Sequence, residues 1–233
     1  MPNLDDICWA TITFREKFLI DDMVYLAVLR NNAFLEKLRN HPQDLDADEV
    51  RSLLVWFLNK WGCRLRNDNI TASNLKNCIV DAHPELLAVQ NHSILNFDFE
   101  LPMNMERIEN IFKRFWDYRS QITNNFGPTA TSKTLHIINP DLFTMWDDEI
   151  KAHHGFPIGS GNEYVQFLIQ AKGIAEGLVN ECIERYGIED PALWLSQNLN
   201  LNPSLSLVKF IDEFNWLAYT GNLLRPPDWV CPF

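Results

Sequence analysis

Apolar side chains recur along most of this chain at intervals of three and four residues, the spacing of one face of an α-helix. The clearest run begins at Asp46, which forms a capping-box pattern with Glu49, and continues with apolar residues to Trp61. Gly62 follows, and glycine commonly ends a helix. The pattern therefore predicts a helix over 46–62.

The same spacing predicts helices along the rest of the chain, and only residues 92–103 are expected to be extended. That segment is interpreted as a connector and not as a strand, because no partner strand is evident. The sequence thus predicts an all-α fold, a compact orthogonal array of about eight to ten helices. The other expected helices cover 21–39, a segment starting near Thr71 or Ser73 that breaks or kinks before Pro84, 104–122, 132–138, a start at 146–153, 160–186, a start at Asp190–Pro191, and 204–219, with a turn at Asn124–Pro128.

The length of the chain suits a single helical domain over residues 1–233. The interruption at 92–103 also permits two packed lobes that meet there, with a cleft between them. Both arrangements are compatible with the pattern.

The charge of the chain bears on whether it binds nucleic acid or membranes. Its net charge is −11, which disfavours broad electrostatic attachment to nucleic acid or to an anionic membrane. Residues 104–133, however, carry five basic against three acidic side chains. This segment is either a local basic patch on an acidic body or a set of ordinary solvated helix faces.

The five cysteines are widely spaced and form no Cys-x-x-Cys pair, which argues against a zinc knuckle or an iron–sulfur cluster. Free buried thiols in a reducing compartment explain them best. The first residues lack the pattern of a secretory signal, and no apolar run is long enough to span a membrane. The sequence therefore predicts a cytoplasmic location and no membrane partner.

Candidate chemistry lies in the segment 126–154. Lys133 stands at the start of a short apolar helix, and Asp147 opens the next helix 14 residues later. A partly desolvated lysine amine can attack an electrophilic carbon, and the helix dipole favours a negative charge at a helix start. The two side chains could therefore share a cleft. The alternative is a surface lysine and an aspartate that only caps a helix.

This segment resembles the helix–hairpin–helix DNA glycosylases, a family that removes damaged bases such as 8-oxoguanine. Residues 129–135 (TATSKTL) match the hairpin position, Lys133 matches the Schiff-base lysine, and Trp146–Asp147 matches the catalytic aspartate. The chain length is similar to that of the archaeal 8-oxoguanine glycosylase branch. The family's hairpin glycines are Thr129 and Thr131 here, and the gap between lysine and aspartate is about one helical turn shorter.

The resemblance implies a DNA glycosylase that acts on damaged double-stranded DNA, with abasic-site lyase activity through Lys133. It assigns catalysis to Lys133 and Asp147, without a metal or other cofactor. The residues implied to hold the DNA backbone are Arg114, Arg119, Thr129, Thr131 and Ser132.

The competing hypothesis is a non-enzymatic helical interaction protein on a related scaffold. The acidic body and the threonines at both hairpin glycine positions favour it. The aromatic residues Trp216, Tyr219 and Trp229 either stack on a flipped base or pack the C-terminal tail. A metal site built from His136, His153 and His154 is the weakest candidate, because their spacing matches no ligand motif.

Overall fold

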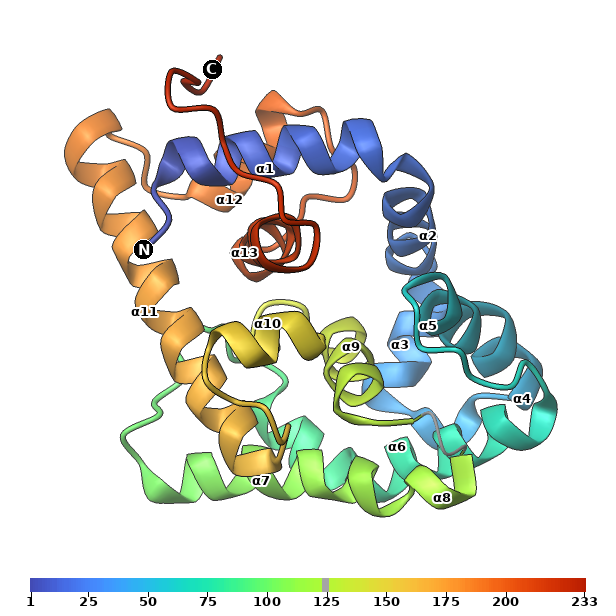
Figure 1. Cartoon of the computed structure of the whole chain (residues 1–233). Helices are drawn as coiled ribbons and strands as arrows, with labels where there is room; N and C mark the ends of the chain where they lie inside the picture. Colours follow the sequence, from blue (N-terminus) through green and yellow to red (C-terminus); the bar gives the residue numbers. More distant parts are fainter. Residues whose placement is uncertain (123–125) are drawn as a thin grey trace.

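The computed structural model describes residues 1–122 and 126–233, and 68% of the chain is helical (Figure 1). No strand occurs in these two ranges, so the predicted all-α class is confirmed. The α-helices are α1 (Leu4–Lys17), α2 (Leu19–Leu29), α3 (Asn32–Asn40), α4 (Ala47–Glu49), α5 (Trp56–Lys60), α6 (Asn69–Val89), α7 (Pro102–Asp117), α8 (Arg119–Ile122), α9 (Pro128–Ile138), α10 (Asp148–His153), α11 (Gly161–Tyr186), α12 (Pro191–Asn198) and α13 (Leu207–Asn215).

The described part of the chain also contains three short helical elements that are not α-helices. A 3-10 turn, η1 (Pro42–Asp44), follows α3. A π-helical stretch, η2 (Val50–Val55), joins α4 to α5, and another, η3 (Trp216–Thr220), continues α13. Single π-helical turns often occur at functional sites, and η3 borders the cavity described below.

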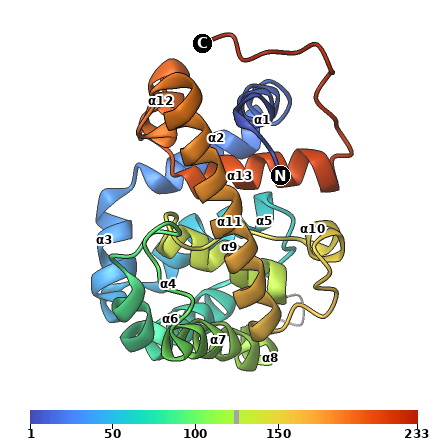
Figure 2. The same cartoon turned by 90° about the vertical axis from the view of Figure 1, so that its left-hand side faces the viewer.

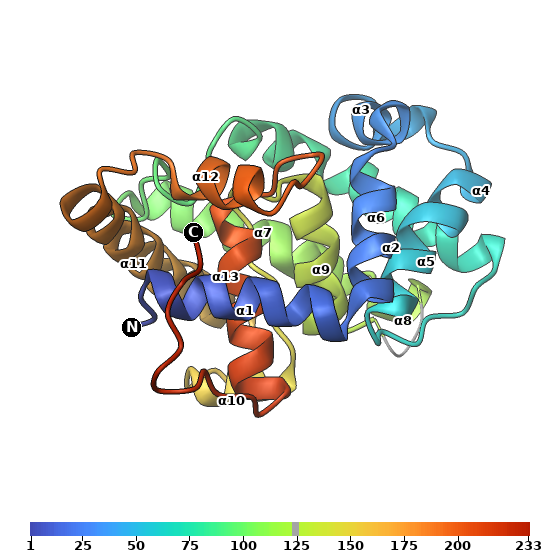
Figure 3. The same cartoon turned by 90° about the horizontal axis from the view of Figure 1, so that it is seen from above.

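Helix α13 lies in the middle of the molecule, where Figure 1 shows it end-on beneath α1. Seen from above, α1 crosses over α13 (Figure 3), and the two helices are in contact. Helices α6 and α7 pack together at the opposite end, and α11 packs against both α7 and α13 (Figure 2). Helices α9 and α10 occupy the space between these layers.

The hydrophobic core draws on residues from both sides of the connector at 92–103. A single cluster of buried apolar side chains extends along the chain from Leu4 to Ile211. Its largest fully buried members include Trp146, Tyr25 and Tyr164. The division into two lobes stays a prediction.

Several predicted helix signals are confirmed by their hydrogen bonds. Asp46 and Glu49 form the expected capping box, and so do Ser160 and Glu163 at the start of α11. Asp190 caps α12. Of the turn expected at 124–128, residues 124 and 125 lie outside the described ranges.

Helix boundaries differ from the prediction at several places, two of which lie in the first half of the chain. The helix expected over 21–39 is split into α2 and α3, because the Asn31 side chain accepts a hydrogen bond from the Phe34 N–H and starts a new helix. The helix expected to break or kink before Pro84 does not break there, and continues as α6 through that residue. Buried side chains on both sides of the proline hold the two halves in one helix, so tertiary packing outweighs the lost hydrogen bond.

None of the helices in the described ranges is both long and apolar enough to cross a membrane.

The central helix α13 buries charged side chains. Lys209 and Glu213 are 0% and 1% exposed and form an ion pair with an N–O distance of 2.6 Å. Arg15 on α1 donates a second charge-assisted hydrogen bond to Glu213 at 2.8 Å. Although burial raises the pKa of Glu213, the neighbouring Arg15 and Lys209 lower it more, and the net shift is downward. A buried ion cluster of this kind is stable only while every partner remains.

Replacing Glu213 with glutamine should test this dependence. Glu213→Gln leaves Arg15 and Lys209 buried without their carboxylate, and we expect the free energy of unfolding to fall by about 3–5 kcal/mol. Urea denaturation followed by circular dichroism measures the change. Asp48→Asn, which breaks the exposed Arg51–Asp48 pair, is the control and should change stability little. Equal effects of the two substitutions would contradict the structural role of Glu213.

Candidate functional site

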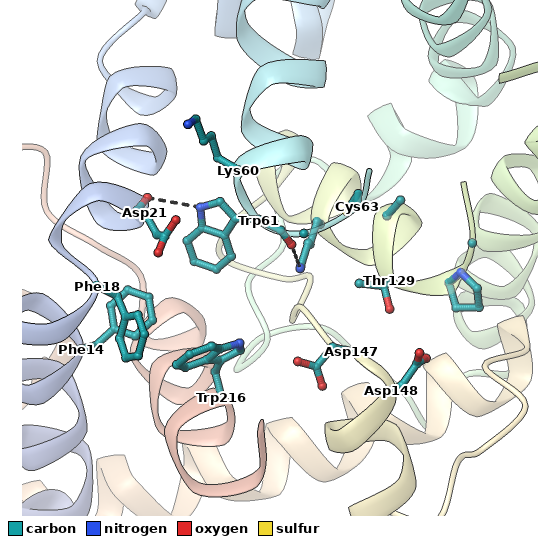
Figure 4. A pocket seen from close by; sticks show the side chains of 15 residues that line it. Phe14, Phe18, Asp21, Lys60, Trp61, Cys63, Thr129, Asp147, Asp148 and Trp216 are labelled. Carbon is teal, nitrogen blue, oxygen red and sulfur yellow. Dashed lines mark hydrogen bonds between the residues drawn. The ribbon is translucent and has the colours of Figure 1, made fainter. Parts of the chain in front are cut away.

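One cavity of about 550 Å³ brings together residues from five parts of the chain. It lies where α1, α5, α9, α10 and η3 approach one another. Figure 4 shows Phe14, Phe18 and Trp216 on one side of it and Thr129, Asp147 and Asp148 on the other. The remaining lining residues are Asp21, Lys60, Trp61, Gly62, Cys63, Gly127, Pro128, Ala130 and Lys133.

Lys133 is one of the two residues to which the sequence assigned catalysis. It lies on α9 and is only 7% exposed. Its Nζ donates a hydrogen bond to the backbone oxygen of Trp61, and lies 5.8 Å from the centroid of the Trp61 ring. The alternative of a surface lysine is therefore wrong, because this amine is buried at the edge of a cavity.

Asp147 is the N-cap of α10, as predicted. Its Oδ1 accepts a hydrogen bond from the Ile150 N–H at 3.0 Å, and its Oδ2 accepts one from the Thr220 hydroxyl at 2.7 Å. Asp147 lines the same cavity as Lys133. The carboxylate is thus held in a fixed orientation by one bond from α10 and one from η3.

Ser132 connects the two candidate catalytic residues. Its hydroxyl donates to the Thr129 carbonyl and accepts a hydrogen bond from the Trp146 N–H at 3.2 Å. Ser132 precedes Lys133, and Trp146 precedes Asp147. This bond therefore fixes the position of α9 relative to the start of α10.

The prediction that Thr129, Thr131 and Ser132 contact a DNA backbone needs correction. Helix α9 begins at Pro128 and not at Ser132, so these residues lie in its first turns. The side chains of Thr131 and Ser132 are both 0% exposed. Of the three, only Thr129 lines the cavity.

The predicted backbone-binding arginines are not part of this cavity. Both are exposed on the surface of α7 and α8. Arg114 forms an ion pair with Glu85 at 3.0 Å, and Arg119 lies 4.3 Å from the centroid of the Trp116 ring. The structure thus brings Lys133 and Asp147 together and leaves these two arginines apart from them.

An aromatic wall closes the side of the cavity formed by α1 and η3. The Trp216 ring packs edge-on against Phe18, with ring centroids 4.5 Å apart, and against Phe14, at 5.9 Å. Trp61 extends the wall, 6.1 Å from Phe14. The sequence signalled Trp216 as a stacking candidate but gave no sign that Phe14 and Phe18 would join it, because they lie about 200 residues away along the chain.

Asp21 is a cavity residue that the sequence pattern did not indicate. Burial raises the pKa of its carboxyl, although Lys60 and Lys133 act in the opposite direction. Its backbone oxygen accepts a hydrogen bond from the Trp61 indole N–H at 3.2 Å, which joins α2 to the end of α5. Asp21 adds a third carboxyl group to the lining, with Asp147 and Asp148.

A smaller void of about 20 Å³ lies beneath the cavity and is bordered by Lys133, Asp147 and the α13 residues Lys209, Asp212 and Glu213. Asp212 accepts a hydrogen bond from the Met145 N–H through Oδ1, and its buried Oδ2 has no hydrogen-bond partner. Burial raises the pKa of Asp212 well above its usual range. The candidate site thus lies directly above the buried charges of the central helix.

The described residues contain no group of three or more His, Cys, Asp or Glu side chains placed to hold a metal ion. His136, a member of the suggested metal cluster, is fully buried, with its Nδ1 2.6 Å from the Phe143 carbonyl oxygen and its Nε2 2.9 Å from the Tyr25 hydroxyl. A neutral ring with Nδ1–H donating and Nε2 accepting satisfies both contacts.

Comparisons with protein-family models, with curated proteins and with solved structures found no match to this chain.

The buried imidazole of His136 should make stability depend on pH. Burial lowers its pKa to about 3, whereas the unfolded chain binds this proton near pH 6.5. The free energy of unfolding is therefore unaffected by this group above about pH 6.5. It falls as the pH drops from 6.5 toward 3, because the unfolded chain binds the proton and the folded protein does not. We expect His136→Gln to remove roughly 2–3 kcal/mol of the wild-type decrease in unfolding free energy between about pH 7 and pH 4.5. Urea denaturation at several pH values measures it, and identical pH slopes for the two proteins would contradict this account.

Proposed function

We propose that this chain is a base-excision DNA glycosylase, with Lys133 as the nucleophile and Asp147 as the stabilising carboxylate. The observation that supports the proposal is the shared cavity: a buried amine, an oriented carboxylate and an aromatic wall line one space. The resemblance of residues 126–154 to the helix–hairpin–helix glycosylases also supports it.

The dimensions of the cavity suit a flipped nucleotide. Its volume of about 550 Å³ lies within the range of ligand pockets, roughly 300–1,000 Å³. A base must leave the duplex before its glycosidic carbon becomes accessible, and aromatic side chains commonly stack on the extruded ring. Phe18 and Trp216, each half-buried at the cavity wall, are suited to that contact.

The chemistry follows from the two side chains. The nitrogen of Lys133 attacks the sugar carbon C1′ with its lone pair, a C–N bond forms, and the bond to the base breaks with its electron pair moving to the base. Positive charge develops on the sugar as that bond weakens. Asp147, which Thr220 and Ile150 hold in place, stabilises this charge without reorienting. The lysine nitrogen then gives one proton to the departing base. Its lone pair forms the C=N bond of the imine as the bond from C1′ to the ring oxygen breaks, and its remaining proton passes to that oxygen; the imine then leads to strand cleavage.

Binding to DNA should be sensitive to salt. The protein carries a net charge of −11, so few cations contact the phosphates. Lys60 is exposed at the cavity, where a phosphate flanking the flipped nucleotide would pass. A few phosphate contacts give weak, local attachment, and its affinity should fall with salt in proportion to the number of those contacts.

The proposed nucleophile can be tested by reductive trapping. Borohydride added to the protein with an 8-oxoguanine duplex should produce a covalent protein–DNA adduct. Lys133→Gln should abolish the adduct, because among the described residues that line this cavity Lys133 carries the buried amine. Lys37→Gln is the control, since Lys37 pairs with Glu49 and does not line the cavity, and it should retain trapping. Adduct formation by Lys133→Gln at the wild-type level would show that Lys133 is not the nucleophile.

The proposed role of Asp147 predicts a kinetic effect without a loss of affinity. Asparagine can still cap α10, so Asp147→Asn should fold. Because the carboxylate acts mainly in the transition state, single-turnover base release should slow by about 10²–10³-fold. The affinity for the duplex, measured by fluorescence anisotropy, should change little. A parallel loss of rate and affinity, or no loss of rate, would contradict the role.

The second candidate function is a non-enzymatic interaction protein. The observations that favour it are the acidic surface and the position of Arg114 and Arg119 away from the cavity. An electrophoretic mobility assay at low salt separates the hypotheses. Salt-sensitive binding to damaged or abasic duplex supports the enzyme, and no binding at any salt supports the interaction protein.

A further inference from the structure

The C-terminal tail is fastened to the first two turns of α1 by a polar clamp. The Arg225 guanidinium forms an ion pair with Asp6, with Nε and Oδ1 2.7 Å apart, and lies 3.7 Å from an oxygen of Asp5. The Cys231 N–H donates a hydrogen bond to the same Asp5 at 2.9 Å. Figure 3 shows the tail crossing α1. These bonds hold Cys231 over α1 in a fixed register.

This clamp places two thiols side by side. Cys8 follows Asp5 by one turn of α1, so the bond between Asp5 and the Cys231 N–H brings the Cys231 side chain next to that of Cys8, within hydrogen-bonding reach. Cys8 is 0% exposed, whereas Cys231 is partly accessible to solvent. The two cysteines lie 223 residues apart, so only the folded chain brings them together. An accessible thiol beside a buried partner is the arrangement found in redox-sensing cysteine pairs.

We propose that Cys8 and Cys231 form an oxidisable dithiol that hydroperoxides convert to a disulfide, locking the tail onto α1. This inference is independent of the proposed glycosylase activity. It assigns Cys231 as the attacking thiol, because it is the accessible member of the pair. Cys8 is the resolving thiol.

The electrostatics of the pair favour this order. The hydrogen bond from Cys8 lowers the pKa of Cys231, and the Phe233 backbone N–H adds to this effect, against the opposing effects of burial and Asp5. The same hydrogen bond between the two thiols, together with burial, raises the pKa of Cys8. The thiolate therefore forms on the side that solvent reaches, where an oxidant arrives.

The reaction balances with one hydroperoxide. The Cys231 thiolate attacks an oxygen of hydrogen peroxide, an S–O bond forms, the O–O bond breaks, and the departing hydroxide takes up a proton to leave as water. The Cys8 sulfur then attacks the sulfenic sulfur of Cys231. An S–S bond forms, and the S–OH group leaves with the Cys8 proton as a second water. Two thiols are oxidised to one disulfide, and one peroxide is reduced to two waters.

The disulfide would close almost the whole chain into a loop. Cross-links that close long loops restrict the unfolded chain strongly, so the oxidised form should melt at a temperature higher by roughly 5 °C. The tail also carries Trp229, which packs against the small cluster that contains Trp9 and Phe14. Because Phe14 lines the cavity, fixing the tail also limits movement of the aromatic wall.

Mass spectrometry of the full-length protein tests the proposal. After treatment with a small excess of hydrogen peroxide and thiol blocking, non-reducing digestion should yield a peptide pair linked through Cys8 and Cys231, lighter by two hydrogen atoms than the free peptides. Cys231→Ser should abolish the link and the shift in melting temperature. Cys78→Ser, which alters a buried thiol on α6, is the matched control and should retain both.

A second experiment tests whether Cys231 reacts with the peroxide before Cys8 attacks it. In Cys8→Ser, the sulfenic acid on Cys231 should persist and be captured by dimedone. Cys8 is buried, so Cys8→Ser could prevent folding. In that case the loss of the Cys8–Cys231 link in Cys231→Ser, which alters a partly exposed residue, still tests the disulfide. Three results would each overturn the proposal: Cys231 oxidised to sulfinic acid while Cys8 stays a free thiol, a link from Cys231 to the neighbouring Cys182, or no oxidation of Cys231.

Discussion

The burial of charged side chains on α13 is the constraint on which the rest of the structure depends. This helix runs through the centre of the molecule with Lys209, Asp212 and Glu213 all removed from solvent. An unpaired ion in that position would cost several kcal/mol, so α1 must cross α13 where Arg15 can reach Glu213. The crossing also places Phe14 beside the candidate site. The charge cluster and the aromatic wall are therefore consequences of one packing arrangement.

The same helix positions the candidate catalytic residues. Asp212 accepts a hydrogen bond from the Met145 N–H, and Ser132 accepts one from the Trp146 N–H. These two bonds hold the link that leads into Asp147 against α13 on one side and against α9 on the other. Rigid support of this kind is what a site needs if a nucleophile and a carboxylate are to act on one carbon atom. Thr220, in the π-helical turn that continues α13, completes the support by donating to Asp147.

The sequence predicted the helices well where local signals decide, and less well where distant packing decides. The capping boxes at Asp46 and Ser160 act within one turn, so both were identified correctly. Pro84 was expected to interrupt its helix, and only long-range burial explains why it does not. Lys133 and Asp147 could be selected from their spacing together with the resemblance of residues 126–154 to a known family. The aromatic wall, the Asp212 contact and the Cys8–Cys231 pair join segments far apart in the chain, and periodicity carries no information about such contacts.

The account depends most on the identity of the reacting amine, and peptide mapping of a trapped adduct measures it directly. The protein is reduced with borohydride on an abasic duplex, digested with protease and nuclease, and sequenced by tandem mass spectrometry. The account predicts a deoxyribose remnant on the peptide that contains Lys133, with none on Lys60, Lys151 or the N-terminal amine. A remnant on any of these other amines, or no adduct on any peptide, would contradict the claim that the cavity of Lys133 and Asp147 performs the chemistry.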